Sequence, residues 1–73
     1  MIEVGKNMKV TFFLDEKKVT KEMKLRERID DYSLTKDEKS KGKFLLVFEN
    51  LSNALKERVI IYEDEIVEYS LLS

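Results

Sequence analysis

The chain has no cysteine, histidine, proline or tryptophan, and only two glycines among its 73 residues. Without cysteine, no disulfide can strengthen the fold and no thiolate can bind zinc or attack a substrate. Without histidine, the commonest metal ligand and general base is missing. Because Gly5 and Gly42 stand alone, the chain also lacks a glycine-rich phosphate loop. These absences predict a protein that is not an enzyme and that binds no metal or other cofactor.

Charged residues make up 40% of the chain and hydrophobic residues 42%, with a net charge of −1. This hydrophobic content is too high for a disordered chain. A chain of this length buries only about 60% of its unfolded surface. We therefore expect one domain over residues 1–73, with residues 1–7 forming either a flexible extension or the first part of a strand. Because the core is small, a homodimer is expected as readily as a monomer.

Long apolar runs are also absent. No stretch approaches the ~18 apolar residues that span a membrane, and the start "MIEVGKNMKV" carries charges where a secretion signal would be apolar. We therefore expect a cytoplasmic protein without membrane contact. Lysine outnumbers arginine eleven to three, a bias that fits a thermophile and equally an AT-rich genome such as that of a phage.

The stretch "VTKEMKLRERID", residues 19–30, decides the fold class. Its composition favours a helix, whereas its polar residues at every even position favour a strand. Residues 8–14 alternate in the same way, and the intervening Asp15–Lys18 suits a four-residue turn that begins with aspartate. Pairing across that turn brings apolar residues together, which a one-residue slip would prevent. The apolar pairs are Leu14–Val19, Val10–Met23, Met8–Leu25 and Val4–Ile29. We therefore predict a hairpin.

The remaining segments add a helical turn and three strands. "TKDE", residues 35–38, fits a capping box, and Gly42 suits a helix end, so we predict a helical turn near residues 36–41. Residues 43–49 are apolar on both faces, as in a central strand. Residues 58–72 are interpreted as a second hairpin around the loop Glu63–Glu65.

The predicted fold is therefore mainly β, either all-β or α+β. It contains a small five-stranded antiparallel sheet, arranged as a barrel or sandwich or left open to dimerise through one face. Loops connect the remaining strands, including residues 50–56.

The second predicted hairpin is apolar on both faces, and only one of them can fill the core. Exposed apolar surface of this kind marks an interface. Three consecutive carboxylates at the hairpin tip suit a basic partner, but they lack the staggered spacing and the glycine of a calcium loop. The predicted protein interface consists of Ile60, Tyr62, Ile66 and Glu68, with Glu63, Asp64 and Glu65 at its rim.

An alternative interpretation starts from the uneven distribution of charge. Residues 17–43 carry +4 and residues 44–73 carry −4. Basic residues beside an aromatic ring are typical of single-stranded nucleic-acid binding, and here they are Phe13, Lys24, Arg26 and Arg28. Interleaved acidic residues and an acidic sequence pI of ≈ 5.5 weigh against it.

The sequence therefore predicts a small, non-enzymatic cytoplasmic protein that presents a β-surface to a protein partner. Its size and composition suit an accessory or inhibitor protein of a virus or mobile element. The identity of the partner is not encoded in any motif. The runner-up is a small β-barrel that binds single-stranded nucleic acid.

Overall fold

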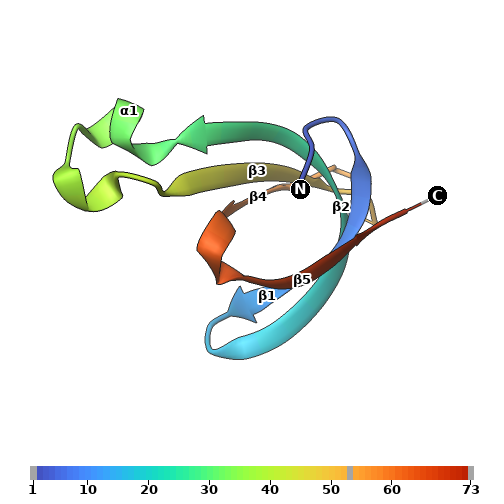
Figure 1. Cartoon of the computed structure of the whole chain (residues 1–73). Coiled ribbons are helices and arrows are strands. Elements are labelled where there is room, and N and C mark those ends of the chain that lie inside the picture. Colours follow the sequence, from blue (N-terminus) through green and yellow to red (C-terminus); the bar gives the residue numbers. More distant parts are fainter. Residues whose placement is uncertain (1, 53, 73) are drawn as a thin grey trace.

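The computed structural model describes residues 2–52 and 54–72, and it confirms the predicted fold class. Five antiparallel strands form one sheet, which curls strongly but does not close (Figure 1). Met1, the first residue of the predicted extension, and Asn53 of the predicted loop 50–56 lie outside the described residues, as does Ser73. The strands are β1 (Asn7–Leu14), β2 (Lys17–Asp30), β3 (Phe44–Asn50), β4 (Arg58–Tyr62) and β5 (Ile66–Leu71).

The strand order is β4-β3-β2-β1-β5. The first four strands form a meander, whereas β5 pairs with β1 at the far edge, so β4 and β5 are successive in the chain but unpaired. The 3-10 turn η2 (Glu63–Glu65) connects these two edges (Figure 1). The predicted second hairpin is therefore wrong: Ile61 pairs with Leu46. The chain leaves β4 through a 3-10 turn, which carries it to the opposite edge of the curled sheet.

The first hairpin is confirmed, but its turn has two residues rather than four. Asp15 and Glu16 both have positive φ, 50° and 65°, as the tight turn that matches strand twist requires. Phe12 consequently opposes Val19, two residues from the predicted register. A shift of two preserves which face each side chain occupies, so Met8, Val10, Phe12, Met23 and Leu25 lie in the core as predicted. The predicted inward residues Val4 and Leu14 are instead exposed, and Ile29 lies beyond a register shift in β2 and outside the core.

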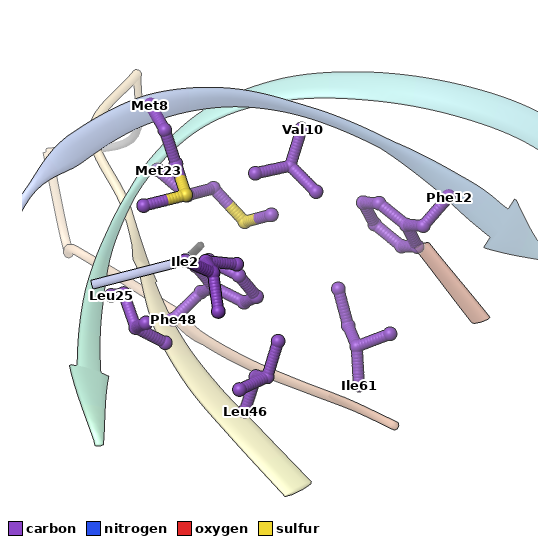
Figure 2. Packing of buried hydrophobic residues seen from close by; sticks show 9 residues of the cluster. All are labelled: Ile2, Met8, Val10, Phe12, Met23, Leu25, Leu46, Phe48 and Ile61. Atoms are coloured by element: carbon purple, nitrogen blue, oxygen red, sulfur yellow. The ribbon is translucent and has the colours of Figure 1, made fainter. Parts of the chain in front are cut away.

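The core lies on the concave face of the curled sheet, where side chains from four strands converge (Figure 2). Ile2, only 8% exposed, joins them from the N-terminal segment. Burial of each large apolar side chain contributes about 1.5–3 kcal/mol. The cluster consists of Ile2, Met8, Val10, Phe12, Met23, Leu25, Leu46, Phe48 and Ile61.

An irregularity in β2 determines which way its second half faces. The β2–β3 register shifts between Leu25 and Glu27, which leaves Arg26 as an extra residue. Before this bulge Leu25 opposes Phe48, and after it Arg28 opposes Leu46. Both β3 residues belong to the core cluster, so the bulge turns Arg28 to the concave side of the sheet.

Between β2 and β3 the chain forms α1 (Asp31–Thr35) and the 3-10 turn η1 (Glu38–Ser40). The predicted helical turn near 36–41 is thus present as η1, whereas α1 lies before it. The Asp30 carboxylate accepts from the amide of Tyr32 and caps α1. The Thr35 hydroxyl accepts from the amide of Asp37, two residues on, instead of forming the predicted capping box.

Candidate functional site

A hollow of about 590 Å³ lies along β5, and we call it the β5 groove. Its apolar residues come from the N-terminal segment and from β5, and its charged residues come from β2, η2 and β5. The curl of the sheet brings these segments together at its open side (Figure 1). The lining residues are Ile2, Arg28, Glu63, Ile66, Val67, Glu68 and Tyr69.

The edge of β5 beside this groove carries main-chain groups that point away from the sheet. The amide of Leu72 donates to the carbonyl of Asn7 in the β1 segment at 2.9 Å. Because antiparallel strands alternate inward and outward groups, the amides and carbonyls of Tyr69 and Leu71 point away from β1. Among the residues that the structure describes, no strand pairs with the outer edge of β5. An extended chain could therefore hydrogen-bond along this edge.

The side chains of β5 make this edge unusually apolar. Val67, Tyr69 and Leu71 are 44%, 39% and 58% exposed, and Glu68 is the only charged residue of the strand. Edge strands are commonly protected from pairing by lysine, proline or covering segments. β5 contains neither lysine nor proline. Its pairing with β1 shifts register at a bulge opposite Thr11 and Phe12, so the regular part of this edge runs from Glu68 to Leu71.

Arg28 forms the polar end of the groove. Its guanidinium donates two hydrogen bonds to the Glu63 carboxylate, at 2.9 and 3.0 Å. It also stacks on the Phe44 ring, 3.6 Å from the ring centre. The hydrogen bond that Arg28 donates to Glu63 is the main cause that raises the pKa of Arg28 above its ordinary value. The pair ties η2 to β2 and so fixes one wall of the groove.

The structure divides the predicted protein interface between several surfaces. Glu63, Ile66 and Glu68 line the β5 groove, and Ile66 also packs against the core cluster. Ile60, 65% exposed, lies on β4, at the other edge of the sheet. The remaining predicted residues occupy β4 and η2, namely Tyr62, Asp64 and Glu65.

Tyr62 faces α1 rather than an open surface. Its hydroxyl donates to the carboxylate of Asp31 at 3.4 Å, and Asp31 is itself buried. The negative charge of Asp31 is the main cause that raises the pKa of Tyr62, followed by burial and by this hydrogen bond. The contact joins β4 to α1, so we assign Tyr62 a structural position.

The residues of the nucleic-acid alternative do not form one stripe. Phe13 and Lys24 lie on the convex face of the sheet, as their alternation with core residues requires. Arg26 lies in the bulge, 3.7 Å from the Glu49 carboxylate. Arg28 is on the concave side and paired with Glu63. Two of the three predicted cations are therefore engaged by carboxylates of this chain.

Sequence reasoning missed Ile2, Val67 and Tyr69 as groove residues. One available signal was the composition of residues 66–72, which carry a single charge and neither lysine nor proline. Alternation indicated which residues share a face of that strand, but not which strand lies beside it. The missing information was thus the position of β5 at an edge.

No protein-family model matches the chain, and comparison with curated proteins and with solved structures gives no match. Within residues 2–52 and 54–72, no three acidic side chains are grouped as a metal site would require. The helices of the same described part are all too short to cross a membrane.

Proposed function

We propose that the protein is a non-enzymatic binding module that takes up an extended segment of a protein partner at the β5 edge. The observation that carries this proposal is the position of the outward main-chain groups of Tyr69 and Leu71. Tyr69 itself lines the β5 groove, and Leu71 follows two residues further along the same strand. In strand addition, main-chain hydrogen bonds supply affinity, and pockets for alternate side chains supply specificity.

The β5 groove has the composition that such recognition needs. Ile2 and Ile66 provide apolar surface, and the Arg28–Glu63 pair provides polar groups at one end. A volume of about 590 Å³ lies within the roughly 300–1,000 Å³ of typical ligand pockets.

A binder of this kind acts by forming a complex with its partner. We propose that it works in the cytoplasm as an accessory or inhibitor protein, and that its source is a virus or mobile element. The support for this source is the small size of the chain and its excess of lysine over arginine. The mode of action requires no chemistry beyond association.

The test begins with peptides selected from a random displayed library against the whole protein. We expect selected peptides to be extended and to protect the amides of Tyr69 and Leu71 from hydrogen exchange, measured by NMR. Val67→Lys should weaken peptide binding, because it places a charge in the β5 groove. The control Ile60→Lys changes an exposed residue of β4 and should leave binding unchanged. Peptides that protect only amides of other strands would contradict the proposal.

A further inference from the structure

We infer that the extended segment received at the β5 edge alternates between basic and apolar residues. Its apolar side chains would lie against Tyr69 and Leu71, and its lysines or arginines would lie against Glu68 and the carboxylates of η2. The inference rests on the proposed strand addition and specifies the chemistry of the partner. The two faces of β5 differ in the way that such a segment requires.

On the concave side, β5 offers apolar surface to an added strand. The partners of Tyr69 and Leu71 on β1 are Val10 and Met8. Because both β1 residues belong to the core cluster and directly opposed residues share a face of the sheet, Tyr69 and Leu71 lie on the concave side. They are nevertheless 39% and 58% exposed. The alternate side chains of an added strand would cover them, which favours apolar residues at those positions.

On the convex side, the same stretch of β5 presents a carboxylate. Glu68 pairs with Thr11, which lies on the convex side because it alternates with core residues of β1. Glu68 is exposed and takes part in none of the salt bridges among residues 2–52 and 54–72. Lys9 lines the same hollow as Glu68 without pairing with it. A basic residue of the added strand beside Glu68 would form a cross-strand pair of opposite charges.

The 3-10 turn η2 extends this negative charge past the beginning of β5. Its Glu63 is paired with Arg28 at 2.9 Å. Its Asp64 and Glu65 are exposed, and neither forms a salt bridge within the described part of the chain. Because β5 begins directly after η2, a strand added along β5 would reach these carboxylates at one end. We call Asp64, Glu65 and Glu68 the acidic edge.

The cations of the chain compensate little of the charge of the acidic edge. The β5 groove is lined by a single arginine and no lysine, and this arginine already binds Glu63. Lys17 and Lys18 lie on β2, and β1 separates that strand from β5. Two strand spacings amount to about 10 Å, a distance over which salt screens most of the attraction between exposed charges. A basic segment would therefore meet complementary charge at this edge, and an acidic one would be repelled.

Two peptides that differ only in charge test this chemistry. One alternates lysine with valine over about eight residues, within the usual length of a strand, and the other has glutamate in place of each lysine. In low salt we expect the lysine peptide to bind the whole protein about tenfold more tightly, because several cross-strand charge pairs change from attractive to repulsive. Fluorescence anisotropy of the labelled peptides measures both affinities. The difference should shrink as salt is raised, since the charges are exposed.

Charge reversal on the protein locates the effect. Glu68→Lys and Glu65→Lys, made separately, should each weaken binding of the lysine peptide and strengthen binding of the glutamate peptide. We expect each to narrow the preference about threefold or more, the scale of one cross-strand charge pair. Glu38→Lys makes the same change of net charge in η1, away from the groove lining. It is the control and should leave the preference unchanged.

The outcomes separate this inference from the proposed function. Equal binding of the two peptides, or binding of neither at millimolar concentration, would overturn the inference. A preference that Glu38→Lys removes as fully as the two variants of the acidic edge would overturn it as well. Strand addition would stand without it if peptides from the displayed library still protect the amides of Tyr69 and Leu71. A lysine preference that only the acidic-edge variants reduce, with protection of these amides by the lysine peptide, supports both.

Discussion

Among single side chains, Tyr62 and Asp31 form a contact whose contribution to stability depends on pH. The charge of Asp31 raises the pKa of Tyr62 above 10.0, with burial and the Asp31 hydrogen bond adding to it, and Glu65 and Asp64 contributing less. The folded chain thus holds the phenol proton more tightly than the unfolded chain. The contribution of the Tyr62–Asp31 contact to stability is therefore complete below pH 10, and it is lost as the pH rises through the pKa of Tyr62 in the folded chain.

We expect Asp31→Asn to lower the pKa of Tyr62, because the substitution removes the negative charge and keeps an oxygen that can accept the hydrogen bond. The phenolate absorbance, followed against pH and corrected with Tyr62→Phe, measures the change. Glu38→Gln, an exposed substitution in η1, is the control and should leave the titration in place. An unchanged pKa in Asp31→Asn would show that burial, rather than Asp31, causes the rise.

At the level of strands and turns, the sequence was sufficient to predict the five strands, but not α1 and not all the strand neighbours. Alternation identified the first hairpin, because only one assignment of faces buries its apolar residues. It could not separate a two-residue from a four-residue turn, since the two registers preserve the same faces. It also could not place Arg28, because the bulge at Arg26 reverses the alternation of β2.

The predicted hairpin of β4 and β5 was wrong for a different reason. Residues 58–72 have the pattern of a hairpin, yet β5 pairs with β1 from the other end of the chain. A period of two tells which residues face the core, whereas the identity of the adjacent strand depends on how the whole sheet curls. The β5 groove follows from that curl, so its residues could not be assembled from local patterns.

The turn between β1 and β2 offers a test of strain at this level. Asp15 and Glu16 both adopt positive φ, which costs a non-glycine residue about 1 kcal/mol or more. The double substitution Asp15→Asn with Glu16→Gly gives the sequence that such turns favour. We expect the free energy of unfolding to rise by about 1 kcal/mol and Tm by about 4–8 °C, measured by thermal denaturation.

The control for this substitution is Lys18→Gly, which places glycine in β2 just beyond the turn. It should lower stability by about 0.5–1 kcal/mol, because glycine is unfavourable inside a strand. If both changes lowered Tm, the strain assigned to the turn would be absent.

Across the whole molecule, the basic middle of the chain lies beside its acidic last part. Arg26 contacts Glu49 of β3, and Arg28 contacts Glu63 of η2. Each contact joins a residue of the +4 segment to one of the −4 segment. The charges of these two arginines are thereby partly neutralised within the fold, which weakens the field that would attract a polyanion.

We therefore expect no binding of oligodeoxythymidine at micromolar protein concentration, measured by fluorescence anisotropy in low salt. The double substitution Glu49→Gln with Glu63→Gln releases both arginines and serves as the comparison, since it should bind more strongly than the wild type. Wild-type binding that weakens steeply as salt rises would restore the nucleic-acid alternative, because phosphate contacts release counterions.

The pairing of β1 with β5 has a consequence for the order in which the protein folds. The first four strands each pair with the next strand along the chain, whereas Met8 meets Leu71 only when almost the entire chain is looped back. Such distant contacts slow folding, because the chain entropy of a long loop is lost before the contact forms. The meander should assemble first, with β5 docking last and opening first in native-state exchange.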